Sequence, residues 1–111
     1  MEKLLREERF LPKEEDGTRC VKILEKALKE FQIPQISVAI GGYAEEAICL
    51  EEGDSGWRVY GGERGEKYNM RVHAACRAAC RDVLSRLADS VEAEREWLEF
   101  FDREYESSLK K

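Results

Sequence analysis

The sequence predicts an α+β fold: an N-terminal helix, a small antiparallel sheet of three to four strands, and two C-terminal helices packed on the sheet. Two observations predict it. Near both ends of the chain apolar residues recur every three or four positions, which is the spacing of one helix face, and in the middle they alternate with polar residues, which is the period of a strand. A length of 111 residues suits a single domain, 1–111.

The first helix is expected over residues 18–33, where the apolar side chains fall on one helix face. The segment before it, 1–15, mixes charged residues with isolated apolar ones and could form a short helix of its own or be loose, as chain termini often are. Pro12 and Gly17 should separate this segment from the helix, since both residues disfavour a helix interior. Pro34 should end the helix, because a proline disfavours helical geometry in the residue before it.

The sheet is expected over residues 35–68. The segments "QISVAI", "AICLEE" and "WRVY" each alternate apolar and polar residues, which predicts three strands. The turn residues "GDSG" lie between the second and third segments and predict an antiparallel hairpin. A fourth short strand around Lys67-Tyr68 would add to the sheet.

Residues 70–109 return to the helical period and predict two helices. Asn69 is a suitable N-cap for the first of them, whose apolar stripe begins at Val72. Asp89, followed three residues later by Glu92, matches the spacing of a capping box and predicts the start of the second helix.

The composition indicates in which compartment the protein is expected and which classes of partner are not expected. No apolar run approaches the roughly 18–20 residues that cross a bilayer, and the first residues lack the apolar segment of a secretion signal, so we expect a cytoplasmic protein without a membrane partner. In that reducing compartment its four cysteines should stay as thiols. The net charge of -5 argues against nucleic acid as a partner, because nucleic-acid binding depends on neutralising phosphates with Lys and Arg.

The charge is distributed unevenly along the chain. From Arg58 to Arg86 there are seven basic residues and three acidic ones, whereas from Asp89 to Glu106 there are eight acidic residues and two basic ones. Carboxylates on a solvated helix face ordinarily serve solubility, but their excess here would also steer a basic protein partner. Four of them are candidate partner-binding residues: Glu92, Glu96, Glu99 and Asp102.

The residues with the most obvious chemistry are His73, Cys76 and Cys80, which could share one helix face. With Cys49 or Cys20 as a fourth ligand they could hold zinc. The favoured interpretation is that the cysteines are small core residues that let the helix approach the sheet. With a single histidine and no recognised nucleophile, phosphate-binding or zinc motif, we expect no enzyme, no cofactor and no metal.

The segment "WRVYGGERGEKYN" places a charged pair, Glu63-Arg64, among three glycines. The glycines permit a tight reversal and predict a hairpin tip or a bulge. The pair has two interpretations. It could hold the hairpin against the last two helices, or it could bind a partner together with Trp57 and Tyr60, since Trp, Tyr and Arg are frequent hot-spot residues.

This segment, with "GGYAEEAICLEE" before it and "AACRDVLSRLADS" after it, resembles a family of small bacterial immunity proteins of polymorphic, contact-dependent toxin systems. The resemblance covers Gly42 to Ser90 and rests on the pattern W-x-V-Y-x-G-E-R-G-x-K-Y-N. The chain departs from the family at Glu66, where the family has Asn. Because the motif is shared by proteins with different toxins, the resemblance favours a structural role for Glu63-Arg64.

The resemblance implies a non-enzymatic protein that binds the C-terminal domain of a cognate secreted toxin in the cytoplasm of the producing cell and neutralises it. A basic nuclease domain would suit the acidic charge, but the pattern does not select among toxin classes. One alternative is an acidic adaptor or regulatory module that binds another protein. A small zinc- or thiol-dependent enzyme is the less favoured alternative.

Overall fold

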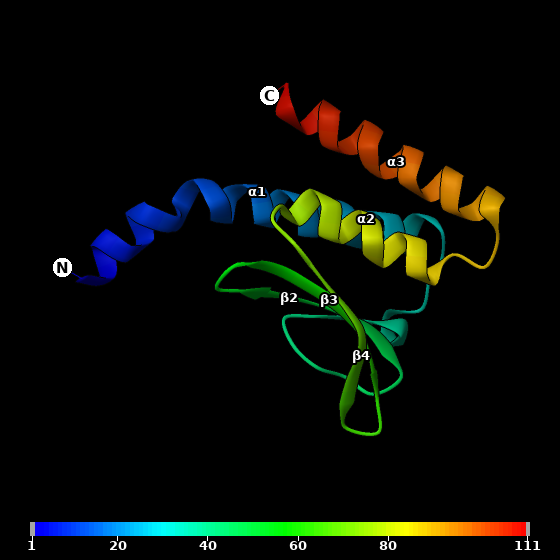
Figure 1. Cartoon of the computed structure of the whole chain (residues 1–111). Coiled ribbons are helices and arrows are strands. Elements are labelled where there is room, and N and C mark those ends of the chain that lie inside the picture. Colours follow the sequence, from blue (N-terminus) through cyan, green and yellow to red (C-terminus); the bar gives the residue numbers. More distant parts are fainter. Residues whose placement is uncertain (1, 111) are drawn as a thin grey trace.

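Three helices and a four-stranded sheet form the described part of this computed structural model, which covers the backbone of residues 2–110 and the side chains of residues 16–110 (Figure 1). The elements are α1 (Glu2–Glu30), the 3-10 turn η1 (Gln35–Ser37), β1 (Val38–Ile40), β2 (Ala47–Gly53), β3 (Gly56–Glu63), β4 (Glu66–His73), α2 (Cys76–Leu87) and α3 (Val91–Leu109). The predicted α+β class and the predicted order of helix, sheet and two helices are confirmed.

The sheet is mixed, whereas the sequence predicted an antiparallel one. Its strand order is β1-β2-β3-β4, and β2, β3 and β4 form the expected antiparallel meander. β1 instead pairs in parallel with β2, with Val38 opposite Ile48 and Ile40 opposite Leu50. The direction follows from residues 41–46, which return along the sheet before β2 begins, so that both strands start at the same end.

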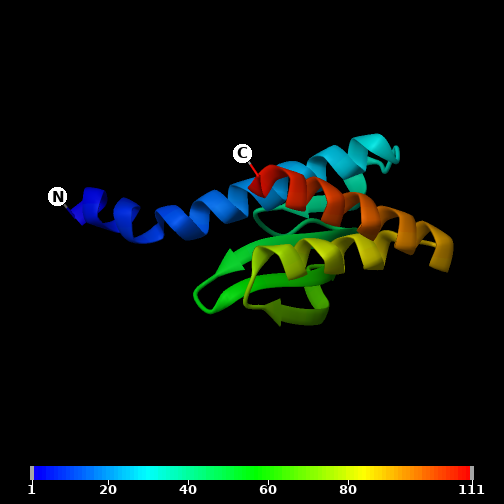
Figure 2. The same ribbon diagram turned by 90° about the horizontal axis from the view of Figure 1, so that it is seen from above.

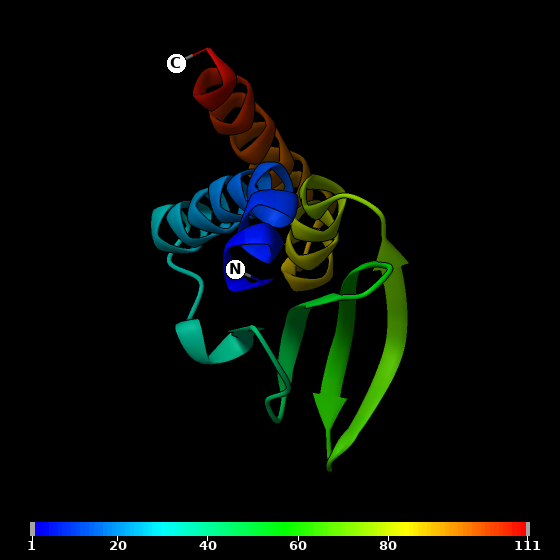
Figure 3. The same ribbon diagram turned by 90° about the vertical axis from the view of Figure 1, so that its left-hand side faces the viewer.

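The helices form two layers over one face of the sheet. α1 and α2 lie side by side, and α3 packs on these two helices on the side away from the strands (Figures 1 and 3). Seen from above, the C-terminal end of α3 lies over α1 (Figure 2). Of the two C-terminal helices expected on the sheet, α2 is therefore the one in contact with it. The aromatic ring of Phe31 meets α3 at Trp97 and Phe100, with centroids 5.7 and 5.3 Å away, so α3 buries its apolar face against helices.

α1 is longer than the helix predicted for residues 18–33. Its backbone continues through Pro12 and Gly17, and it bends in its N-terminal part (Figure 1), as helices do where a proline removes a backbone hydrogen bond. Gly17 serves a close contact: a Cβ there would lie 2.9 Å from Cζ2 of Trp57. Whether residues 1–15 are loose depends on how their side chains pack. These side chains lie outside the described ones, so looseness of this segment stays a prediction.

β4 continues to His73, beyond the sheet boundary predicted at residue 68. Asn69 is therefore not an N-cap. It lies within the strand with a φ of 54°, and together with Met70 it opposes Tyr60 at a β-bulge. The extra residue shifts the side-chain alternation of β4 from that point onward.

The two C-terminal helices begin later than the sequence predicted. α2 starts after Ala75, which has no capping side-chain bond. α3 starts after Ser90, whose Oγ accepts the backbone N–H of Ala93 at 3.0 Å. Ser90, and not Asp89, is thus the N-cap, because its hydroxyl satisfies one of the free N–H groups of the first helical turn.

The main core joins the helices to one sheet face. Its fully buried side chains come from α1, α2, α3, β2 and β3 and include Leu24, Leu84, Phe101, Leu50 and Val59. A second, small cluster of Ala47, Cys49 and Tyr60 lies apart from the main core. None of the described helices is long and apolar enough to cross a membrane.

Candidate functional site

Trp57 and Tyr60, two of the predicted partner-binding residues, are both buried. Trp57 is 8% exposed and packs in the main core against Gly17. Tyr60 is fully buried in the second cluster, with the Nζ of Lys67 5.0 Å from the centre of its ring. Three residues apart on one strand, the two side chains occupy opposite sheet faces, and both faces are covered here. They hold the sheet in place and are not available to anchor a partner.

Glu63 and Arg64, the next two candidates, lie exposed at the β3–β4 turn. Arg64 and Gly65 are its central residues and both have positive φ, 55° and 77°, as a type I′ hairpin turn requires. Neither Glu63 nor Arg64 forms an ion pair with any helix residue whose side chain is described, and the turn lies at the end of the sheet away from α3 (Figure 1). The predicted contact between this pair and the last two helices is absent.

The loop between β1 and β2 holds the turn instead. Glu45 accepts the backbone N–H of Arg64 at 2.7 Å and that of Gly65 at 2.6 Å, one on each carboxylate oxygen. The hydroxyl of Tyr43 donates to Glu45 at 2.6 Å and also lies 2.7 Å from the N of Gly65. The hydrogen bond from Tyr43, followed by those from the two amides, lowers the pKa of Glu45. The carboxylate therefore acts as a latch for the turn in its charged form.

The four candidate carboxylates of α3 fall into two groups. Asp102 is turned toward α2, where one oxygen lies 3.4 Å from Nη2 of Arg77 and the other accepts a hydrogen bond from Arg81. The other three are exposed and form no ion pair within the described part of the chain: Glu92, Glu96 and Glu99. Their spacing of four and three residues puts these three on one helix face. These three form the free acidic face of α3, on which the exposed Arg95 and Arg103 also lie without forming an ion pair with them, whereas Asp102 contributes to helix packing.

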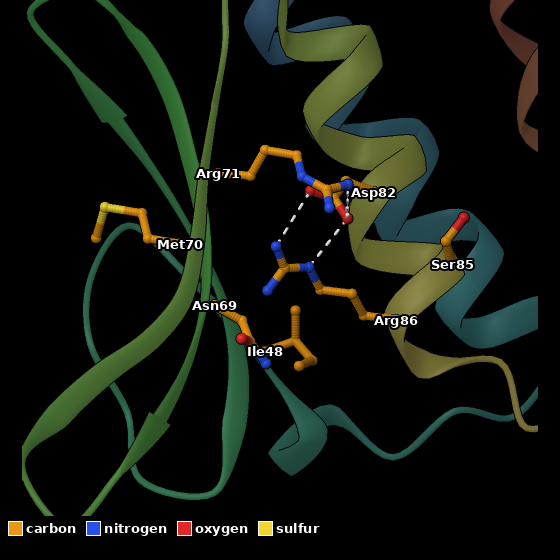
Figure 4. Close-up of a pocket in the computed structure, with 7 residues that line it drawn as sticks. All are labelled: Ile48, Asn69, Met70, Arg71, Asp82, Ser85 and Arg86. Carbon is orange, nitrogen blue, oxygen red and sulfur yellow. Dashed lines mark hydrogen bonds and ion pairs between the residues drawn. The ribbon is translucent and has the colours of Figure 1, made fainter.

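A groove of about 660 Å³ opens between β4 and α2 (Figure 4). At its inner wall lies Asp82, which is 8% exposed. Its carboxylate oxygens lie 2.8 Å from Nε2 of His73, 2.9 Å from Nε of Arg86 and 3.9 Å from Nη1 of Arg71. Burial by itself would raise the pKa of Asp82, but the hydrogen bonds from Arg86 and His73 outweigh burial, so the pKa is lowered. The groove thus contains a charged carboxylate surrounded by donors.

The side chains of the remaining lining residues point in different directions relative to the groove. Asn69 and Ile48 extend into the space between strand and helix, whereas Met70 and Ser85 point away from it (Figure 4). None of these groove residues was a candidate from the sequence. One signal was present, since Asp82 and Arg86 are four residues apart on a helix, the spacing of an intrahelical ion pair.

The histidine and cysteines do not come together as a metal site. His73 is bound to Asp82, and Cys49 lies in the second cluster, away from the other thiols. Cys76 and Cys80 are in contact, with 3.8 Å between their sulfur atoms, and both are buried. Among the described side chains no group of three His, Cys, Asp or Glu residues could hold a metal ion. The cysteines instead occupy core positions, as the favoured interpretation had them.

The buried thiols are also poor nucleophiles. A hydrogen bond to Cys76, together with burial, raises the pKa of the Cys20 thiol far above its ordinary value. The contact with Cys20 lowers the pKa of Cys76, but the contact with Cys80 and burial outweigh it and raise the pKa. A thiol that keeps its proton and lies in the core reacts slowly.

Comparisons of the chain with protein-family models, with curated protein sequences and with solved structures give no match.

Proposed function

We propose that this protein is an immunity protein, which binds and neutralises the C-terminal domain of a cognate secreted toxin in the cytoplasm of the producing bacterial cell. The observation that carries the proposal is the free acidic face of α3, made by Glu92, Glu96 and Glu99 in the outer layer of helices. The resemblance of residues 42–90 to the immunity family supports it independently.

The acidic face suits a basic partner. Its carboxylates form no ion pair among the described residues, although Arg95 and Arg103 lie on the same side of the helix, whereas Asp102 is neutralised by Arg77 and Arg81. Unpaired surface charges of one sign raise the rate at which an oppositely charged protein arrives, and they do so less at high salt. A basic toxin domain is therefore the partner class that this face favours.

Partner specificity lies outside the glycine-rich motif in this proposal. The motif has a structural role, since it forms the type I′ turn at Arg64-Gly65, which Glu45 latches. A sequence element that builds the fold can be shared by immunity proteins with different toxins, while the exposed helix face is free to differ among them.

Binding, and not catalysis, is the proposed activity. The single histidine of the chain is engaged with Asp82, and the Cys20 and Cys76 thiols are buried with raised pKa. Nucleophilic catalysis by cysteine needs an accessible thiolate beside a base. These contacts therefore favour inhibition by complex formation over a zinc- or thiol-dependent enzyme.

The proposal is tested by co-expressing the full chain with the C-terminal domain of a secreted toxin encoded beside its gene, followed by co-purification and a growth assay. A stable complex that restores growth is the expected result. A well-folded protein that neither binds nor protects would overturn the immunity proposal and leave the acidic adaptor.

The binding surface is tested by two matched variants of equal charge change. The first replaces the acidic face, Glu92→Gln, Glu96→Gln and Glu99→Gln. The second replaces three other exposed acids, Glu30→Gln, Asp54→Asn and Glu66→Gln. We expect the first variant to associate about tenfold more slowly at low salt with a flatter salt dependence, as lost electrostatic steering predicts. Equal association rates for the two variants would exclude α3 as the binding face.

A further inference from the structure

The groove between β4 and α2 contains more hydrogen-bond donors than the carboxylate of Asp82 accepts. Asp82 engages the Nε of Arg86 and one of its terminal nitrogens, Nη2 at 3.4 Å, which leaves the other terminal nitrogen. The side chain of Arg71 is 67% exposed, and its Nη1 lies 3.9 Å from an Asp82 oxygen. The side-chain amide of Asn69 forms no hydrogen bond with a described residue and extends into the same space (Figure 4).

Arg86 is held in place before any ligand arrives, and Arg71 lies close to it. Arg86 is fixed by its bonds to Asp82, with 17% of its side chain exposed, and Arg71 extends toward the same carboxylate from the neighbouring strand. The planar guanidinium groups present several N–H donors and match the geometry of carboxylate and phosphate oxygens. Because Arg86 is already fixed, its side chain loses little entropy on binding.

We propose that this groove binds an oxyanion, either a carboxylate or a phosphate, between the guanidinium groups of Arg71 and Arg86 and the amide of Asn69. Two positive charges against the one of Asp82 leave the lining with an excess of one positive charge. A cation would meet these arginines, and an apolar ligand would find Ile48 as the one apolar side chain among the labelled residues that extends into the groove (Figure 4). An anionic oxygen group satisfies the donors that the groove leaves unused.

The ligand could come from two sources with the same chemistry, a free phosphate or the acidic side chain of a protein. The experiment separates them by titrating the isotope-labelled full chain at neutral pH with sodium phosphate and, separately, with N-acetylglutamate N-methylamide. Sodium chloride keeps the ionic strength constant. The side-chain N–H signals of Arg71, Arg86 and Asn69 are followed by nuclear magnetic resonance.

We expect saturating shifts of these signals with at least one probe. Shifts with phosphate alone assign a phosphate site, shifts with the glutamate derivative alone assign a site for an acidic side chain, and shifts with both assign a general oxyanion site. Arg71→Gln, at a residue exposed enough to tolerate the change, should weaken binding about tenfold, which corresponds to losing one charge-assisted hydrogen bond.

Arg64→Gln is the matched control, because it removes the same charge from an exposed position on the same hairpin, away from the groove lining. It should leave the titration unchanged. Absence of saturating shifts with both probes, or equal weakening by the two variants, would overturn the proposal. Since the experiment needs no toxin, its failure would leave the immunity proposal standing.

Discussion

Glu45 holds the backbone of Arg64 across nineteen residues of sequence, with its Oε1 2.7 Å from the amide nitrogen. Arg64 is a non-glycine residue with a positive φ of 55°, a conformation that L-residues seldom adopt. The bond from the β1–β2 loop offsets this strain by satisfying an amide that a turn would otherwise leave to water. Glu45 thus accounts for the conformation of the turn, but because it bonds only the backbone of Arg64, it does not account for an arginine side chain at this position.

Glu45→Gln should make the unfolding free energy less dependent on pH. The pKa of Glu45 is lowered in the fold, so its contribution is complete above the ordinary value of 4.5 and is lost as the pH falls through the lower folded-state pKa. The amide has no such titration. Urea unfolding at a series of acidic pH values measures this, with Glu63→Gln as the control on the same hairpin. Identical pH profiles for Glu45→Gln and the unaltered protein would contradict the latch.

Gly62→Ala should destabilise the protein far more than Gly61→Ala. A Cβ at Gly62 would overlap the backbone carbonyl oxygen of Ala44, which cannot move without disturbing the loop. A Cβ at Gly61 would meet the outer end of the Tyr68 ring, which is 45% exposed and can swing away. We expect a loss of about 1–3 kcal/mol for Gly62→Ala, the usual cost of overpacking. Thermal unfolding of the pair gives the comparison, and equal losses would contradict it.

Asp82→Asn should cost on the order of 2 kcal/mol of unfolding free energy, because a buried carboxylate that accepts bonds from Arg86 and His73 is replaced by a weaker acceptor. Because the pKa of Asp82 is lowered in the fold, the contribution of its carboxylate to stability is complete above pH 3.8. This contribution is lost as the pH falls through the lower folded-state pKa. Asp102→Asn, at a side chain that is 36% exposed, should cost less than about 1 kcal/mol. Denaturant unfolding at neutral pH measures both losses of unfolding free energy. A larger loss for Asp102→Asn than for Asp82→Asn would contradict this ranking.

The four thiols should be protected from a water-soluble thiol reagent in the native protein. Cys20, Cys49 and Cys80 are fully buried and Cys76 is 3% exposed. Labelling followed by absorbance should therefore proceed at the rate of opening and rise sharply in denaturant. One rapidly labelled cysteine under native conditions would place that thiol outside the core.

For the candidate site, the sequence identified the residue types but not their exposure. The acidic residues of α3 were recognisable from charge alone, yet Asp102 differs from Glu92 only because Arg77 and Arg81 of another helix lie beside it. Burial of Trp57 depends in the same way on contact with Gly17, forty residues earlier in the chain. The groove residues were missed because β4 and α2 meet there through tertiary packing.

The sequence by itself determined the element types, because the spacing of apolar residues reflects which side of a helix or strand is buried. It predicted the β2–β3 hairpin, whose turn residues are local, and it failed at Pro12 and Asn69, where local rules favoured a break and a cap. Only the tertiary structure decided the parallel direction of β1, the outer position of α3 and the link from Glu45 to the turn. These depend on contacts between distant segments, whose energies outweigh local preference and leave no periodic signal in the chain.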